Sequence, residues 1–443
     1  MGAPRKTPVL IREDRAWRFH GGIKLPGHKD MSTKNAISRL PSSDRYVIPL
    51  NQHIGAEGEI LVAGGDRVLK GQMLARPRGL ISATVHSPVS GKVVEIAEYR
   101  FPHPSGIAGV CIVIENDHRD EWIERRPLGD DYANTSSHQL RNIVRDAGIV
   151  GLGGAAFPAA VKQTEVGIET LILNGVECEP YISCDDMLMR ERAENIIKGA
   201  RIIAHIINAE QCIVAIEDNK PEALEAVVRA VENDGSNAIK VQVVPTIYPS
   251  GGERQLIKLI TGREVPVNGL PTDINVLCHN VATSYAIYKA VYEGEPLISR
   301  IVTVTGRGVE SPQNLEVDIG TPIRQCIDYC GGYQKDARAL IMGGPMMGLT
   351  LDTDDLPVIK ATNCLLVTAG IVIRLPESEA HMPCIRCGQC VEVCPANLLP
   401  QQLYWFSGNR DYDRAVDYTL FDCIECGCCA YVCPSRIPLV QYY

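Results

Sequence analysis

The chain has 443 residues, a formal net charge of −9 and a hydrophobic share of 45%. This length predicts several domains rather than one core, and the negative charge argues against general nucleic-acid binding. The chain has 17 cysteines and no apparent secretory leader, which indicates a reducing compartment. No segment reaches the roughly 18 consecutive apolar residues of a membrane-spanning helix.

The first predicted domain covers residues 20–125. The basic segment that opens the chain, through Arg18 and Lys24, is expected to be a disordered tail, with contact to a membrane face as the alternative. Glycine-punctuated strands are predicted at 46–50, 59–62, 83–87 and 92–96. They resemble the barrel-sandwich hybrid fold of lipoyl and biotinyl carriers. Because no lysine lies in 79–85, where the modified hairpin would be, we expect a structural or docking module instead of a carrier.

The second predicted domain, residues 130–295, alternates helices and strands. Ser136 or Ser137 is expected to cap a helix that ends at Asp146. Further strands are expected at 170–173, 212–216 and 239–244, and helices at 187–207 and 221–231. This alternation predicts an α/β layer with a parallel sheet.

The remaining chain is predicted to form two smaller domains. Residues 298–355 carry strands at 301–305, 314–317 and 340–342 and a helix at 322–330, which fits a β-grasp module. Residues 375–443 contain two cysteine runs that are joined by a helical segment, 398–418. The fold class is therefore a multidomain α/β protein with a cysteine-rich helical domain at its C-terminal side.

The cysteine runs carry the strongest chemical signal. Each has the spacing C-x2-C-x2-C-x3-C-P, which supplies ligands for two [4Fe–4S] clusters in ferredoxin-like domains. Zinc sites and disulfides do not explain a repeated tetrad followed by proline. Because the fourth cysteine of a run ligates the other cluster, we assign one cluster to Cys384, Cys387, Cys390 and Cys433, and the other to Cys423, Cys426, Cys429 and Cys394. Cys428 is expected to be a non-ligand, and the scattered cysteines elsewhere to be core residues.

A glycine-rich loop at 151–162, GLGGAAFPAAVK, is the second feature. It is not a dinucleotide fingerprint, because its spacing differs and a helix precedes it. Gly151, Gly153 and Gly154 would let backbone N–H groups approach a phosphate, and Lys162 would add a positive charge. A plain tight turn is the alternative.

Polar residues follow at the ends of predicted strands or the starts of helices. Asn174, Glu177 and Glu179 end a strand at the edge where parallel sheets bind ligands, or are solvated turn residues. Taken singly, Glu253 is a helix-start carboxylate and Asn280 a helix cap.

Together, the order GxGGxxFPxxxK, NGVECEP, YPSGGE and HNVAT resembles the flavin subunit of respiratory complex I. With the flanking modules, residues 20–440 resemble the RnfC component of Rnf electron-transport complexes, including an SLBB-like β-grasp module and a double [4Fe–4S] domain. Leu152 and Ala156 depart from the complex I pattern, in which an arginine and a glycine stand at these positions.

The resemblance implies contacts to FMN and to NADH. It implies FMN contacts from Gly151, Gly153, Gly154, Lys162, Asn174, Glu177, Tyr248, Gly251, Gly252, His279 and Asn280, with Phe157, Glu179 and Glu253 near the NADH. It also implies a peripheral NADH-oxidising enzyme on the cytoplasmic face of a bacterial or archaeal membrane. Its partners would be membrane subunits and ferredoxin, with coupling to Na⁺ or H⁺ translocation. The alternatives are a soluble flavin/iron–sulfur cobalamin reductase and a non-catalytic electron relay.

Overall fold

A five-stranded parallel sheet forms the centre of the α/β domain in the computed structural model, which describes residues 9–12, 16–163, 167–370 and 382–443. The strand order is β1-β12-β11-β10-β13. The strands are β1 (Leu10–Ile11), β10 (Thr170–Gly175), β11 (Gln211–Glu217), β12 (Ile239–Val244) and β13 (Val276–Asn280). The parallel sheet predicted from the alternating pattern is confirmed.

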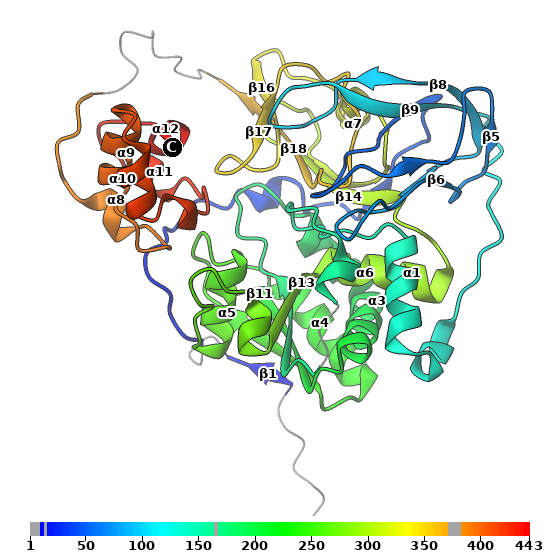
Figure 1. Ribbon diagram of the computed structural model, residues 1–443, viewed down its shortest axis with the longest axis horizontal. Coiled ribbons are helices and arrows are strands. Elements are labelled where there is room, and N and C mark those ends of the chain that lie inside the picture. The colour runs from blue at the N-terminus through cyan, green and yellow to red at the C-terminus, as the bar shows by residue number, and fades with distance from the viewer. Residues whose placement is uncertain (1–8, 13–15, 164–166, 371–381) are drawn as a thin grey trace, which may run out of the picture.

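Helices cover both faces of this sheet (Figure 1). Leu171 and Leu173 of β10 pack in one core, whereas Ile172 between them packs in the other, as the alternation of side chains along a strand requires. The first core is shared with α1 (Ser137–Asp146), α3 (Cys184–Ile207), α4 (Pro221–Asp234) and α6 (Val281–Tyr288), and the second with α5 (Glu253–Thr261). Ser136 caps α1 through a capping box with Gln139, as the sequence predicts.

The basic opening segment, from Arg5 to Lys24, is not a disordered tail where the structure describes it; residues 5–8 and 13–15 lie outside the described part. β1 pairs with β12, and Trp17 N donates to Leu259 O at 2.9 Å. Ile23 and Tyr248 exchange backbone hydrogen bonds of 2.8 and 2.9 Å. Our expectation failed because this basic segment obtains its order from backbone pairing with the α/β domain, which local composition does not reveal.

The N-terminal module contains two antiparallel sheets around a shared core. The four-stranded sheet comprises β3 (Arg45–Pro49), β9 (Gly109–Asn116), β8 (Gly91–Tyr99) and β5 (Arg67–Val68). The three-stranded sheet comprises β4 (Glu59–Ile60), β6 (Met73–Arg76) and β7 (Val85–His86). Two facing sheets agree with the predicted barrel-sandwich hybrid.

The β-grasp domain is a six-stranded mixed sheet with one helix, α7 (Ile323–Tyr329). Its strands are β17 (Leu349–Leu351), β16 (Ala337–Met342), β18 (Cys364–Ala369), β14 (Ser299–Thr305), β15 (Gln313–Asp318) and β2 (Ser38–Arg39). The edge strand β2 comes from the N-terminal segment, which therefore adds a strand to two different sheets.

The cysteine domain is built from short helices and lies beside the α/β domain (Figure 1). Its helices are α8 (Gln389–Glu392), α9 (Pro400–Gly408), α10 (Tyr412–Asp417), α11 (Cys428–Tyr431) and α12 (Leu439–Tyr442). The predicted helix at 398–418 is thus two helices. The break occurs because Arg410 has φ +58° and Asp411 begins a new helix by accepting from Arg414 N.

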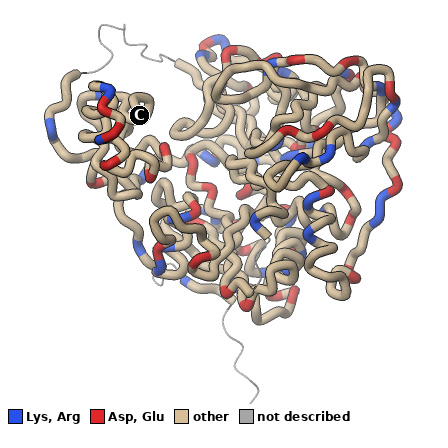
Figure 2. Tube along the Cα trace, viewed as in Figure 1, with Lys and Arg blue, Asp and Glu red and all other residues tan. Residues whose placement is uncertain are grey.

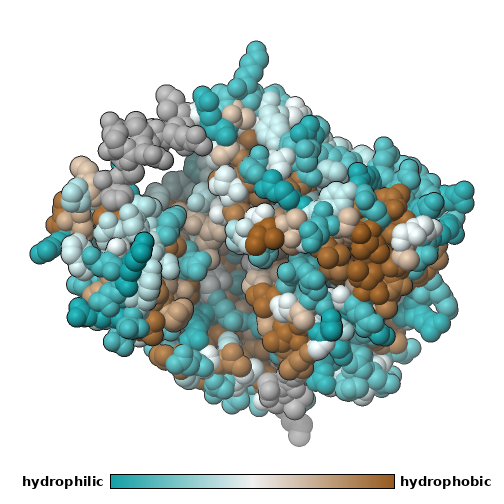
Figure 3. All heavy atoms as spheres, turned by 45° about the horizontal axis from the view of Figure 1, so that its top comes forward, coloured by the Kyte–Doolittle hydropathy of each residue, from teal (hydrophilic) through white to brown (hydrophobic). Residues whose placement is uncertain are grey.

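The surface is mixed in character. Acidic and basic residues are interspersed along the chain (Figure 2), and apolar side chains on the face of Figure 3 form separate patches within a mostly polar surface. Among the residues that the structure describes, no helix combines the length and the apolar content that crossing a membrane requires. The four predicted domain boundaries stay predictions.

Candidate cofactor site and cysteine cavities

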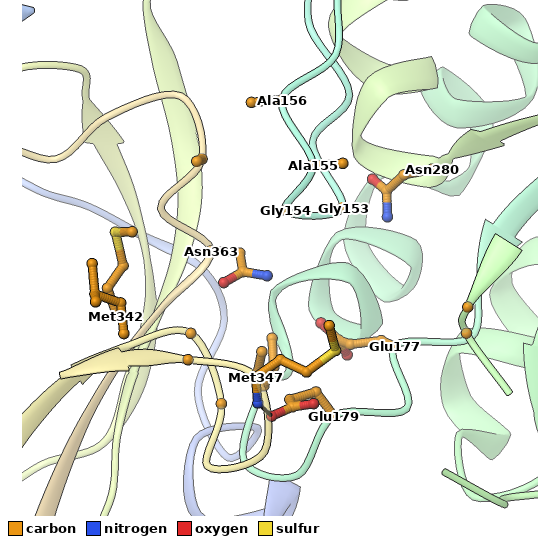
Figure 4. A pocket seen from close by; sticks show the side chains of 18 of the residues that line it. Gly153, Gly154, Ala155, Ala156, Glu177, Glu179, Asn280, Met342, Met347 and Asn363 are labelled. Carbon is orange, nitrogen blue, oxygen red and sulfur yellow. Dashed lines mark hydrogen bonds between the residues drawn. The ribbon is translucent and has the colours of Figure 1, made fainter. Parts of the chain in front are cut away.

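All four domains contribute to one cavity of about 870 Å³. The predicted site residues in its lining are Gly153, Gly154, Asn174, Glu177, Glu179, Tyr248, Gly251, Gly252, Glu253 and Asn280. Figure 4 shows Gly153 and Gly154 at the tip of their loop with Asn280 beside them, and Glu177, Glu179 and Met347 across the opening. Motifs more than 100 residues apart in the chain therefore meet around one space.

The glycine loop is a closed turn before the short helix α2 (Ala159–Lys162). Gly151 N donates to Phe157 O at 2.7 Å, and Ala156 N donates back to Gly151 O at 3.1 Å. Gly154 has φ +111°, and a Cβ there would meet nothing within 4 Å because it would point into open space. The turn thus presents bare backbone to the cavity, which is the geometry that close approach of a cofactor needs.

The two glutamates of NGVECEP have different partners. Glu177 accepts from Asp185 N at 2.7 Å and Asp186 N at 3.2 Å, so its carboxylate caps the start of α3. Glu179 accepts from Met346 N at 2.7 Å and Met347 N at 3.1 Å, which lie in the β-grasp loop 343–348. Burial raises the pKa of Glu179 although those two amides oppose the shift. The β-grasp domain therefore holds one wall of the cavity in place.

Two asparagine side chains, Asn174 and Asn280, hydrogen-bond to neighbouring segments of the cavity lining. Asn174 Nδ2 donates to Gly251 O at 2.9 Å, which joins the strand end to the YPSGGE loop. The Asn280 side chain accepts from Ala282 N at 2.8 Å, so the predicted cap is confirmed, and it also donates to Asp185 at 2.6 Å.

Four predicted residues, Gly151, Phe157, Lys162 and His279, are not in the cavity lining. Lys162 Nζ donates to Glu253 Oε1 at 2.6 Å and to Cys278 O at 2.8 Å, so its charge is directed to a carboxylate. His279 is buried, and burial together with Lys162 lowers its pKa to about 3. Lys162 thus contacts the cavity lining through Glu253, and the FMN contacts of Lys162 and His279 stay predictions.

The cysteines of the C-terminal domain gather around two small cavities. One is lined by Cys384, Cys387, Cys390 and Cys433, and the other by Cys394, Cys423, Cys426 and Cys429. Each cavity thus has four thiols, three from one run and the fourth from the other, a donor set that suits an iron–sulfur cubane. Cys428 is buried but lines neither cavity.

The second of these cavities lies next to the large one. Tyr248 lines the large cavity and donates through its hydroxyl to Cys426 O at 2.8 Å. Ile424, between two of the cysteines, lines both cavities. The large cavity and this cysteine cavity therefore share Ile424 and are linked by the hydrogen bond between Tyr248 and Cys426.

The sequence reasoning missed several parts of the lining. Residues 51–54 and 101–104 of the barrel-sandwich module form part of the wall, and Ile54 N donates to Ala156 O of the glycine loop at 3.2 Å. Asp185, at the start of α3, also lines the cavity. Local signals could not identify them, except that Asp185 follows NGVECEP closely and is one of two adjacent acidic residues.

Comparisons with known proteins agree with the four-domain organisation. Family models match residues 17–119 (RnfC barrel sandwich hybrid domain), 144–289 (Nuo51 FMN-binding domain), 301–350 (SLBB domain) and 383–437 (4Fe-4S dicluster domain). An NAD⁺-reducing [NiFe]-hydrogenase in the H₂-reduced state is 19% identical with a TM-score of 0.50, covering 72% of this chain and 61% of that one. At this identity the match concerns the fold alone.

Several curated relatives are named as the C subunits of ion-translocating oxidoreductase complexes. Those from Erwinia tasmaniensis, Pseudomonas aeruginosa and Serratia proteamaculans are 48%, 50% and 46% identical over 98%, 96% and 98% of this chain. The chain spans 54%, 54% and 61% of their lengths, so roughly half of each relative has a counterpart here. Because these relatives are at least 46% identical over nearly the whole of this chain, and a family model for the RnfC barrel sandwich domain also matches, the protein belongs to the RnfC family.

Proposed function

We propose that the chain oxidises NADH, and that the electrons pass through FMN in the large cavity to two [4Fe–4S] clusters. The observation that carries this proposal is that ten of the fourteen predicted flavin and NADH residues line one cavity, which shares Ile424 with a cysteine cavity and is linked to it by the hydrogen bond from Tyr248 to Cys426. FMN, when bound, supplies the conversion between two-electron hydride chemistry and single-electron transfer. The residues of the chain would bind and orient the FMN and the NADH, and would exclude water from them.

The glycine loop and the asparagines are the proposed FMN contacts. Gly153 and Gly154 offer backbone at the loop tip, and Asn174 and Asn280 line the cavity from the ends of two adjacent parallel strands. Glu179 and Glu253 are proposed to lie near the NADH. Lys162, which is paired with Glu253, is proposed to position that carboxylate.

The cysteines are proposed to bind two clusters with crossed ligation. The nearer cluster would be held by Cys423, Cys426, Cys429 and Cys394, and the outer one by Cys384, Cys387, Cys390 and Cys433. Cys394→Ser should damage the nearer cluster, and Cys428→Ser, a buried cysteine in the same run, should leave both clusters intact. Electron paramagnetic resonance of the reduced protein distinguishes the clusters; damage confined to the outer cluster would contradict the assignment.

Further along the path, we propose that electrons pass to other subunits of a membrane-bound complex and to ferredoxin. In this proposal the chain is peripheral on the cytoplasmic face, and electron flow is coupled to Na⁺ or H⁺ translocation. Co-purification with integral membrane subunits would support it, and a fully active chain with no such association would favour a soluble reductase.

The direct test is an anaerobic preparation of the intact protein. We expect bound flavin that NADH bleaches, together with about eight iron atoms per chain. Lys162→Ala combined with Glu179→Gln should abolish NADH oxidation while the iron content is retained. A protein with its full iron complement that holds no flavin after reconstitution would refute the proposal, and an unimpaired double variant would remove the NADH-site assignment.

A further inference from the structure

Asp185 lies between two cavities. It belongs to the lining of the large cavity and also to that of a second cavity of about 30 Å³, which is large enough to hold water. The second lining combines apolar residues, such as Leu152 and Ile301, with charged and polar residues that include Ser299, Arg300 and Glu316. Asp185 is therefore shared between the lining of the proposed cofactor space and that of a small chamber.

The Asp185 carboxylate is buried and has no direct ion pair. The residue is 7% exposed, its carboxylate accepts from Asn280 Nδ2 at 2.6 Å, and within the described part of the chain no basic nitrogen lies within 4.0 Å of it. Charged and titratable groups facing it are Glu177, Cys184, Arg300 and Lys220, with Lys289, Glu295 and Glu316 across the small cavity.

These surroundings shift the pKa of the Asp185 carboxyl group. Burial, followed by the charge of Glu177, raises the pKa of Asp185 to about 7, although Asn280, Arg300 and Lys220 oppose the shift. A group with this pKa gains and loses a proton at neutral pH at little free-energy cost.

The proposed chemistry requires a group of this kind. Oxidation of NADH yields NAD⁺, two electrons and one proton, and only the electrons can leave through iron–sulfur clusters. The proton that arrives with the hydride must be released when the electrons depart. If Asp185 receives it, the N–H bond of the reduced cofactor breaks and an O–H bond forms on the carboxylate, while the clusters take the two electrons one at a time.

We propose that Asp185 is the proton carrier that connects the cofactor cavity to the small chamber whose lining includes Ser299, Arg300 and Glu316. This inference rests on the proposed NADH oxidation. From the chamber the proton has a short way to solvent, because the side chains of Glu295 and Glu316 are 13% and 15% exposed and Glu316 contacts Arg39, which is 44% exposed.

The neighbouring Asp186 provides a matched control. It is also buried in the first turn of α3, where the helix dipole stabilises a carboxylate. However, it is held by Arg190 through bonds of 2.8 and 2.7 Å and lines neither cavity. A merely structural role at the start of the helix should thus be shared by both residues, whereas proton transfer should depend on Asp185.

The experiment uses the intact protein with flavin and clusters, mixed with NADH in a stopped-flow instrument with a pH indicator. In Asp185→Asn we expect proton release to slow about 100-fold, the range for loss of a general acid or base, while NADH still bleaches the flavin. Asp186→Asn should release protons at the rate of the unsubstituted protein. Normal proton release in Asp185→Asn, or an equal loss in both variants, would overturn the proposal.

Two further measurements keep the inference testable if Asp185→Asn does not fold. Ser299→Val changes the lining of the chamber and leaves the lining of the large cavity unchanged. We expect this variant to release protons severalfold more slowly, while NADH bleaches the flavin normally. Unchanged proton release would contradict the proposed proton route through the chamber. Infrared titration of the protein without cofactors should show a carboxyl group that titrates near neutral pH and persists in Asp186→Asn. Its absence would also count against the proposal. If the unsubstituted protein binds no flavin, the proposed function fails instead, independently of Asp185.

Discussion

Lys360 offers the sharpest test of how the domains are joined around the cavity. It is 1% exposed, and its Nζ donates to Thr84 O of the barrel-sandwich module and to Gly148 O of the α/β domain, both at 2.7 Å. No carboxylate lies within ion-pair distance among the residues that the structure describes. Burial therefore lowers the pKa of Lys360 from 10.5 to about 7.

The direction of the pH effect follows from proton counting. Above about pH 7 folded Lys360 has lost its proton, whereas the unfolded chain keeps it up to about pH 10.5. Stability rises with pH wherever the unfolded state binds more protons, so the contribution of Lys360 increases through this window. From about pH 7 to about pH 9.5 the gain is about 3 kcal/mol, because each pKa unit corresponds to about 1.4 kcal/mol.

The assay is urea unfolding of the intact chain at both pH values, with Lys360→Met as the perturbation. The free energy of unfolding of the unsubstituted protein should rise relative to the variant by about 3 kcal/mol at the higher pH. Lys220→Met is the control. Lys220 is equally buried, but Glu217 raises its pKa against the effect of burial, so its contribution should stay constant over this window. A pH-independent difference for Lys360→Met would refute the reasoning.

Three other predictions concern the cavity and the clusters. In Gly344→Ala the new methyl would overlap Glu179 Cγ, so the hydrogen bonds from the β-grasp loop to Glu179 should break. The KM for NADH should then rise about tenfold in steady-state kinetics. An unchanged KM would contradict the role of the loop. Tyr248→Phe removes the hydroxyl that donates to Cys426 O and should weaken the contact between the two domains by about 1–2 kcal/mol. Cluster reduction in rapid-mixing experiments should become slower while flavin remains bound. Equal rates of cluster reduction in the variant and the unsubstituted protein would exclude this contact from the electron path. Anaerobic iron chelation should increase hydrogen exchange first in residues 382–443, since a small metal-bound domain obtains folding energy from its metal; earlier exchange in the α/β domain would contradict this.

Local patterns along the chain predicted much of the fold and part of the candidate site. The spacing of the cysteines indicated the donor sets, and the alternation of helices and strands predicted the parallel sheet, because both depend on neighbouring residues. The glycine turn at 151–157 could likewise be read locally, since its hydrogen bonds close within seven residues.

Tertiary structure decided what depends on distant partners. Lys162 reaches Glu253, 91 residues away, a contact that its position in the motif did not predict. Barrel-sandwich residues 51–54 became a cavity wall, and the basic opening segment supplied edge strands to two sheets. Asp185 gained its connecting position from the meeting of α3, α6 and β14. These features arise from packing between domains, and no local window of the sequence contains both sides of such a contact.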